Sequence, residues 1–176
     1  GLDWDEGPYI QSERAERHRS VAKQLVAAGH AYECTCTKDE LDVRADAQRA
    51  AGLPPGYDGQ CRDLDDATRA ARRTEGRPIT IRFRTPDDGR STFVDVVRGE
   101  VSVEWANGRD VVLVRPDGSP IFYLANAVDD LDMGITHVVR GEDLVDTTHR
   151  VLAIRRAMGI ATTPVYAHCP LILGPG

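Results

Sequence analysis

Three of the four cysteines have a spacing that suits a metal site. Cys34 and Cys36 alternate along an extended stretch, so both side chains point to the same face of a strand. Cys61 follows after 24 intervening residues. Three converging thiolates bind zinc, and a chain of this length and aliphatic content does not need a disulfide framework. The pattern predicts a zinc site in a cytoplasmic protein; the alternative is three buried free cysteines.

Arg140 is the second candidate for chemistry. It ends the apolar segment VVR and is followed by Gly141, Glu142 and Asp143. A guanidinium binds a carboxylate through two parallel hydrogen bonds. The arginine also stands at the carboxyl end of a predicted strand, where open α/β sheets bind ligands. The position favours an anion-binding arginine; the alternative is a structural ion pair with Glu142 or Asp143.

Residues 62–84 form a basic segment in an acidic chain. They hold seven arginines against four acidic residues, whereas the whole chain has a net charge of −6. Arg69, Arg72 and Arg73 have the spacing of one helix face. Two interpretations stay open: contact with nucleic-acid phosphates, which makes affinity depend on salt, and a solvated charged helix.

The elements that carry these residues begin with helices. A helix is predicted over 12–28, with Ser12 as N-cap and Gly29 after its end. Residues 30–36 predict a strand, and Thr37 with Glu40 forms a capping box for a helix over 38–51. Residues 52–63 are rich in turn formers, and a third helix is expected over 65–75.

From residue 78 the pattern changes to short strands. Segments 79–85, 92–97, 100–105 and 110–115 predict a small antiparallel region of roughly 45 residues. A strand over 136–140, a helix over 147–158 capped by Thr147 and a strand over 165–173 follow. Strand–helix–strand is the unit of a parallel sheet. The order predicts an α/β fold interrupted by an inserted domain.

Composition narrows the class of protein. The chain is 28% charged and 41% hydrophobic, which is typical of a globular protein with its own core. Its apolar runs are only a few residues long, which excludes a membrane span. The negative net charge argues against coating of nucleic acid by bulk electrostatics. The chain opens with Gly1 and closes on LILGPG, and we expect it to be a piece of a longer protein.

Several strings, read in order, resemble a known family. They are GLDWDEGPYIQSER, AYECTCT, YDGQCRD, FVDVVRGEVSV, DVVLVRPDGSPIFYLANAVDDLDMGITHVVRGEDL and YAHCPLIL. Together they are similar to the catalytic half of bacterial glutamyl-tRNA synthetase, a class I aminoacyl-tRNA synthetase. The resemblance implies a Rossmann-type catalytic domain interrupted by an α+β connective insertion. Residues 1–30 would end the first Rossmann half, 31–124 form the insertion that contacts the acceptor end, and 125–176 begin the second half.

The resemblance also implies a reaction and its partners. The α-carboxylate of L-glutamate attacks the α-phosphorus of ATP, with Mg²⁺ offsetting charge, and the glutamyl group then passes to tRNA-Glu. The HIGH-type and KMSKS-type motifs that touch ATP are missing from the sequence. We therefore expect the 176 residues alone to be inactive. The family implies a cytoplasmic enzyme without a membrane partner, and we expect a monomer.

The family's binding residues fall on particular positions of this chain. Arg140 matches the cation that binds the amino acid, and Asn126 matches an orienting asparagine. Phe122 stands where the family often has tyrosine. Phenylalanine lacks the hydroxyl that would hydrogen-bond the substrate, so only its ring would line the pocket. Tyr123 could supply that hydroxyl instead, but on a strand its side chain would face the opposite side. Asp143 matches an acidic position near the ATP site, with a helix N-terminal charge as the alternative. No catalytic residue is expected within the segment.

The resemblance extends to the metal site. Cys34, Cys36 and Cys61 fall where zinc-containing members place thiolates, and Asp63 stands where those enzymes usually have histidine. Tyr57, four residues before Cys61, is the ligand in a related paralogue. The fourth ligand is therefore Asp63 or Tyr57. Cys169 is expected in the core of the last strand, and the histidines at 137, 149 and 168 are expected to be structural.

Two other functions compete with this interpretation. The paralogue that glutamylates the queuosine base of tRNA-Asp shares the QSER-like, CxC and ITHVVRG strings. The long insertion over 37–60 and the string over 110–137 favour the glutamyl enzyme instead. The third possibility is a zinc-binding tRNA module without catalytic activity.

Overall fold

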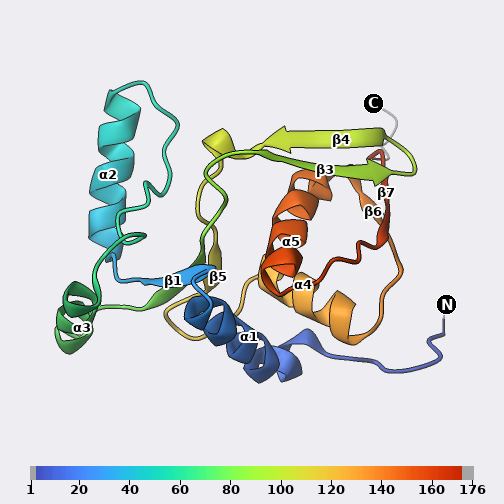
Figure 1. The fold of residues 1–176 in the computed structure, drawn as a ribbon, viewed down its shortest axis with the longest axis horizontal. Helices are drawn as coiled ribbons and strands as arrows, with labels where there is room; N and C mark the ends of the chain where they lie inside the picture. Colours follow the sequence, from blue (N-terminus) through green and yellow to red (C-terminus); the bar gives the residue numbers. More distant parts are fainter. Residues whose placement is uncertain (1–2, 172–176) are drawn as a thin grey trace, which may run out of the picture.

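Two β-sheets organise the chain in the computed structural model, which describes residues 3–171 (Figure 1). An antiparallel sheet has the order β1-β2-β5, and a mixed sheet has the order β4-β3-β7-β6. The strands are β1 (Ala31–Cys34), β2 (Thr80–Phe83), β3 (Arg90–Asp95), β4 (Gly99–Glu104), β5 (Val112–Val114), β6 (His137–Gly141) and β7 (Val165–Cys169). Cys34 ends β1 of the first sheet and the other two candidate zinc ligands follow it in the chain, whereas Arg140 lies in β6 of the second sheet.

Five α-helices accompany the sheets in the described part of the chain. They are α1 (Ala15–Ala27), α2 (Lys38–Ala50), α3 (Asp66–Thr74), α4 (Phe122–Asp132) and α5 (Val145–Ala157). Short 3₁₀ turns precede α1 and α5 at Gln11–Arg14 and Glu142–Leu144, and another follows β4 at Trp105–Asn107. α2 and α3 lie at one end of the molecule, away from α4 and α5 (Figure 1). Within residues 3–171, no helix is both long enough and apolar enough to cross a bilayer.

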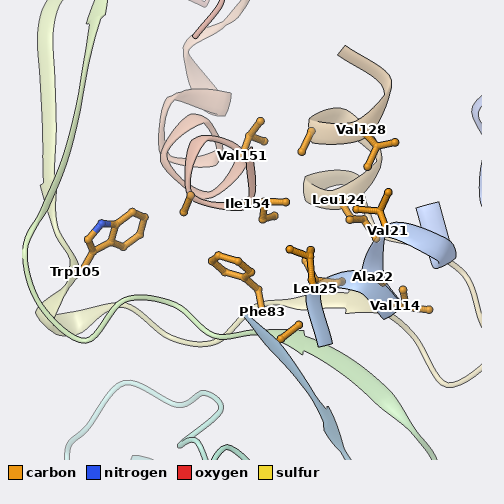
Figure 2. Packing of buried hydrophobic residues seen from close by; sticks show 14 residues of the cluster. Val21, Ala22, Leu25, Phe83, Trp105, Val114, Leu124, Val128, Val151 and Ile154 are labelled. Atoms are coloured by element: carbon orange, nitrogen blue, oxygen red, sulfur yellow. The ribbon is translucent and has the colours of Figure 1, made fainter. Parts of the chain in front are cut away.

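One apolar core joins α1, α4 and α5 to the three-stranded sheet. Val21 and Leu25 of α1 face Leu124 of α4, while Ile154 of α5 and Phe83 of β2 close the same cluster (Figure 2). Leu124 and Ile154 are fully buried. Since burying an aliphatic side chain contributes roughly 1.5–3 kcal/mol, this core fixes the helices on either side of Arg140.

The local signals around α2 and α3 are confirmed. The Thr37 side chain accepts from the amide of Glu40 at 3.3 Å, and the Glu40 carboxylate accepts from the amide of Thr37 at 2.9 Å. Asp65 caps α3 by accepting from Thr68. Gly52 follows α2 with φ +73°, a left-handed conformation that glycine adopts without strain. The helix ends at this end of the molecule are therefore encoded locally.

We expect Thr37→Ala to loosen α2 without disturbing the rest of the fold. The change removes the side-chain acceptor of the capping box, a loss of about 1 kcal/mol. Amide hydrogen exchange in α2 should become about fivefold faster, because exchange of helical amides follows local opening. Thr163→Ala, in the exposed loop before β7, is the control. Unchanged exchange in α2 would show that the cap does not limit its opening.

The predicted strand–helix–strand unit is confirmed, but the single antiparallel region is wrong. β6 and β7 pair in parallel through α5, with Arg140 opposite His168. The four predicted strands divide between the two sheets: β2 and β5 join β1, whereas the β3–β4 hairpin joins β7. Alternation within a strand does not encode its partner, so the sequence left the division open. The domain boundaries at 30 and 124 stay a prediction, and β3 and β4 fall between them.

Other expectations need correction. Ser12 caps no helix, because 11–14 form a 3₁₀ turn before α1. Thr147 lies inside α5, which begins two residues earlier. Cys169, expected in the core, is exposed at the end of β7. The predicted strand over 165–173 ends at 169, and its residues 172 and 173 lie outside the described residues.

Candidate substrate pocket and metal centre

Arg140 lies at the end of β6 and reaches between α4 and α5. Its Nε donates to His168 Nε2 at 3.1 Å, and Nη1 donates to Asn126 Oδ1 at 3.3 Å. Nη2 donates to Thr148 Oγ1 at 2.7 Å and to the Leu144 carbonyl at 3.4 Å. All these acceptors are neutral, so none of the hydrogen bonds that hold the guanidinium comes from a carboxylate.

The structural ion pair considered for Arg140 is not formed. Glu142 pairs instead with Arg98, and Asp143 is exposed within the 3₁₀ turn after β6. Within residues 3–171 no carboxylate forms an ion pair with Arg140. Burial lowers the pKa of Arg140, while the charges of Asp130 and Asp143 act in the opposite direction. A half-buried cation without a carboxylate partner is suited to bind an anion.

Phe122 and Asn126 share one face of a helix. The prediction that Tyr123 lies on a strand is wrong, because the segment forms α4. Its buried residues recur at helical spacing, as Leu124 and Val128 show. Asn126 donates to Asp130 Oδ2 at 2.8 Å while accepting from Arg140. Phe122 is 45% exposed at the start of α4, whereas Tyr123 packs under the Arg150 guanidinium.

The helix that carries Asn126 is clamped to α1 by ion pairs. Arg14 pairs with Asp129 at 2.7 Å and with Asp132 at 2.6 Å. Arg17 pairs with Asp132 at 2.9 Å, and its hydrogen bond lowers the pKa of that carboxyl. The fully buried His18 contacts Asp129 at 2.7 Å. These contacts fix the rotation of α4 about its axis and hence the direction of Asn126.

Asp95 and Thr148 were not predicted as site residues, and His168 was predicted only to be structural, yet all three belong to the hydrogen-bond network of Arg140. Asp95 at the end of β3 accepts from His168 Nδ1 at 2.6 Å and is 1% exposed. Thr148 is fully buried on α5 and contacts both Arg140 and His168. The sequence did hold a signal for Asp95. The alternation of apolar and polar residues along the strand places this carboxylate on the buried face, where charged side chains are rare.

Cys34, Cys36 and Cys61 form one buried cluster. Their sulfur atoms all lie within 4.8 Å of one another, and the Cys36 and Cys61 sulfurs are 3.4 Å apart. Sulfurs bound to one tetrahedral zinc ion lie roughly 3.8 Å apart, so the arrangement fits the ion. Hydrogen bonds from the Cys34 and Cys36 thiols lower the pKa of Cys61. Cysteines from two distant segments are thus brought together as a ligand set.

The two candidates for a fourth ligand lie in different places. Asp63 is exposed and pairs with Arg84 at 2.8 Å, outside the group of sulfurs. The Tyr57 hydroxyl accepts from the backbone amide of Cys61 at 2.9 Å, and the ring packs against the cysteine cluster. Tyr57 is therefore adjacent to the thiols in this structure.

The arginines of α3 contact neighbouring protein atoms, although the side chain of Arg73 stays half exposed. Arg69 donates to the carbonyl of Glu33 at 2.7 Å, and Arg73 pairs with the carboxylate of the same residue. Arg72 Nη1 lies 3.5 Å from the Cys61 sulfur. Arg69 and Arg72 thus contact β1 and the thiol cluster, while no residue of α3 is buried. Both interpretations of the basic segment, contact with tRNA phosphates and a solvated charged helix, stay open.

The histidines other than His168 have separate surroundings. His137 is exposed and contacts Thr136. His149 is buried and shares a hydrogen bond of 3.0 Å with Ser91, and burial lowers its pKa. Within residues 3–171, neither belongs to a group of potential metal ligands. The structural roles expected for them stay a prediction.

Comparison with known proteins identifies the protein family to which the chain belongs. Residues 1–176 match the family described as tRNA synthetases class I (E and Q), catalytic domain. The chain therefore belongs to this family of class I aminoacyl-tRNA synthetases.

Individual relatives specify the similarity further. The chain is 50% identical to a glutamate–tRNA ligase of Streptomyces griseus over 188 residues, covering 100% of this chain and 37% of the relative. It is 46% identical to glutamate–tRNA ligase 2 of Koribacter versatilis over 175 residues, covering 99% and 36%. A glutamate–tRNA synthetase structure from Elizabethkingia anophelis superposes with a TM-score of 0.90 at 33% identity, covering 100% of this chain and 38% of that one. The chain thus spans little more than a third of the length of these relatives.

Proposed function

We propose that the chain is part of a glutamate–tRNA ligase, which attaches L-glutamate to tRNA-Glu through a glutamyl-adenylate. The observation that carries the proposal is Arg140, a half-buried guanidinium held by neutral acceptors and unpaired with any described carboxylate. Such a group suits an anionic amino acid. The structure of a relative from Elizabethkingia meningosepticum, 33% identical with a TM-score of 0.88, is of a glutamate–tRNA ligase in complex with its amino acid.

In the proposed site the side-chain carboxylate of glutamate docks on Arg140. Asn126 orients it, and Phe122 provides an apolar wall. The α-carboxylate oxygen then attacks the α-phosphorus of ATP and pyrophosphate leaves; the ribose hydroxyl of tRNA next attacks the glutamyl carbonyl and AMP leaves. Chemistry of this kind depends on positioning and electrostatic stabilisation rather than on a protein nucleophile. Asp143, exposed beside Arg140, is proposed to face the Mg²⁺-bound ATP.

We also propose that Cys34, Cys36 and Cys61 hold a structural zinc ion with Tyr57 as the fourth ligand. The proximity of the Tyr57 hydroxyl to Cys61 supports Tyr57, while the pairing of Asp63 with Arg84 leaves that carboxylate engaged elsewhere. A zinc ion in a closed site of this kind supplies folding energy, not catalysis. It would pin the loop between α2 and α3 to the end of β1.

The organisation proposed for the chain follows the family. Residues 1–30 and 125–176 belong to the two Rossmann halves, and 31–124 form the connective insertion that contacts the tRNA acceptor end. The location of α2 and α3 at one end of the molecule supports an insertion that projects from the α/β part (Figure 1). A monomer in the cytoplasm completes the proposal.

Aminoacylation by the complete gene product tests the function. With ATP, Mg²⁺ and tRNA present, we expect glutamate-dependent pyrophosphate exchange and transfer of labelled glutamate to tRNA-Glu. Labelling of queuosine-containing tRNA-Asp instead would identify the paralogue. Binding of tRNA without exchange or transfer would support the non-catalytic zinc module. Unmodified tRNA-Asp is the matched control, because it differs from the paralogue's substrate only at the base.

A further inference from the structure

A continuous chain of hydrogen bonds leads from a buried carboxylate to Arg140. Asp95 Oδ2 lies 2.6 Å from His168 Nδ1, and His168 Nε2 lies 3.1 Å from Arg140 Nε. Asp95 is 1% exposed and His168 is fully buried. The three residues come from the ends of β3, β7 and β6, which are neighbours in one sheet. The chain therefore belongs to the framework of the mixed sheet.

Donor chemistry fixes the tautomer of His168. A guanidinium N–H only donates, so Nε2 must accept from Arg140 through its lone pair. Nδ1 then carries the proton and donates to Asp95. Hydrogen bonds from His168, Val97 and Arg98 outweigh burial and hold the pKa of Asp95 at about 2, so this carboxylate is ionised at neutral pH and accepts. The pair thus presents a single acceptor to Arg140.

Packing prevents the imidazole from turning away. Its ring stacks on Tyr166 with centroids 5.9 Å apart and an interplanar angle of 11°, and Phe93 lies 6.0 Å away. The Asp95 carboxylate also accepts from the backbone amide of His168, at 3.1 Å, which fixes the strand beneath the ring. Thr148 Oγ1 lies 3.1 Å from Nε2 on the other side. The acceptor is therefore rigid before any ligand arrives.

The contacts of Arg140 are of unequal length, and this inequality matters for binding. The bonds to Thr148 and His168 measure 2.7 and 3.1 Å, whereas those to Asn126 and the Leu144 carbonyl measure 3.3 and 3.4 Å. A carboxylate forms shorter, charge-assisted bonds with a guanidinium. An incoming carboxylate can replace the two long contacts while the two short ones keep the plane of the guanidinium fixed.

We propose that Asp95 and His168 are positioning residues for substrate binding: together they orient the Arg140 guanidinium so that its Nη atoms face the glutamate carboxylate. The proposal rests on the role of Arg140 in the proposed function. Neither residue touches substrate, and both act through Arg140. Asp95 selects the His168 tautomer that is protonated on Nδ1, and His168 Nε2 accepts from Arg140. Because the guanidinium is already fixed, Arg140 does not lose rotamer freedom when the substrate binds.

Asp95→Asn in the complete gene product tests the tautomer. The amide keeps the shape but can place an N–H toward Nδ1, which moves the ring proton to Nε2 and sets two donors against each other at Arg140. We expect the KM for glutamate to rise about tenfold, the effect of one lost hydrogen bond to a charged group, with the KM for ATP unchanged. An unchanged KM for glutamate in a folded Asp95→Asn protein overturns the proposal.

The pair His168→Gln and His168→Asn separates the two ring nitrogens. Glutamine places an amide oxygen near the position of Nε2, and asparagine places its amide near Nδ1. We expect His168→Asn to raise the KM for glutamate like Asp95→Asn, and His168→Gln to recover most of that loss. His137→Gln, on the exposed part of β6, is the control. Equal values for both variants would assign His168 a purely structural role.

Two further readouts keep the outcomes distinct. In the wild-type protein, ¹⁵N NMR of labelled histidine should show Nδ1 protonated and Nε2 unprotonated; a protonated Nε2 overturns the proposal even if every variant fails to fold. Wild-type protein that does not use glutamate refutes the proposed function itself. Wild-type protein that uses glutamate and depends on Arg140, with unaffected Asp95 and His168 variants, refutes only the positioning role.

Discussion

Arg140→Ala in the complete gene product should lower kcat/KM for glutamate about 10²–10³-fold, or about 2.7–4 kcal/mol of transition-state stabilisation. The change removes a cation that the described residues leave unpaired, and with it both bonds to a bound carboxylate. Arg140→Lys should lower kcat/KM about 10–100-fold, because a point charge does not replace a bidentate fork. Steady-state aminoacylation at varied glutamate concentration measures both effects.

The control for these variants is Arg156→Lys. Arg156 lies near the end of α5 and is exposed, so its replacement should leave the glutamate kinetics unchanged. A rise in the KM for glutamate with an unaffected KM for ATP places the lost interaction at the amino acid. Unchanged kinetics in Arg140→Lys would assign Arg140 a structural role and remove the main support for the proposed substrate.

Local patterns in the sequence predicted the helices well because their signals lie within a few residues. The capping box of Thr37 and Glu40 and the glycines after α1, α2 and α3 set helix ends without help from distant contacts. The start of α1 could not be predicted in the same way. Residues 11–14 form a 3₁₀ turn, and Arg14 turns toward Asp129 of α4, more than 100 positions away.

The pairing of the strands was harder to predict from the sequence than the helices. β3 alternates buried and exposed residues whichever sheet it joins, and only the pairing of Asp95 with Tyr166 of β7 assigns it to the mixed sheet. The same limit applied to the site. Arg140 was predicted from its position after an apolar strand and Asn126 from the family strings, whereas Asp95 is marked only by a carboxylate on the buried face of β3 and Thr148 has no local mark of function. Both residues contact His168 of β7, Asp95 from β3 and Thr148 from α5. These residues are far apart in the sequence, so the contacts could not be predicted from it.

The two candidate sites differ in what they need from the fold. Arg140 depends on residues of the mixed sheet and on α4 and α5, which share the apolar cores. Within residues 3–171, the apolar cluster around the three thiols has four buried members, namely Tyr32, Cys34, Cys36 and Cys61. A cluster this small contributes little hydrophobic stabilisation, so the segment between β1 and α3 should depend on a metal ion more than the α/β core does.

Cys61→Ser should therefore remove zinc and loosen one end of the molecule. We expect the complete gene product, purified without chelator and with reduced thiols, to carry about one equivalent of zinc at this site, because a closed structural site loses its ion slowly. The variant should carry about a tenth of that or less. Amide exchange over 31–63 should accelerate, while α4 and α5 keep their protection, since metal binding is coupled to folding only locally.

Cys169→Ser is the matched control, because Cys169 is exposed at the end of β7 and lies outside the sulfur cluster. It should keep the zinc of the wild-type protein. Comparison of Tyr57→Phe with Asp63→Ala then identifies the fourth ligand. The structure favours faster zinc loss in Tyr57→Phe, since the phenol lies beside Cys61 while Asp63 is paired with Arg84. Wild-type protein without zinc would leave three buried thiols that pack as small apolar side chains.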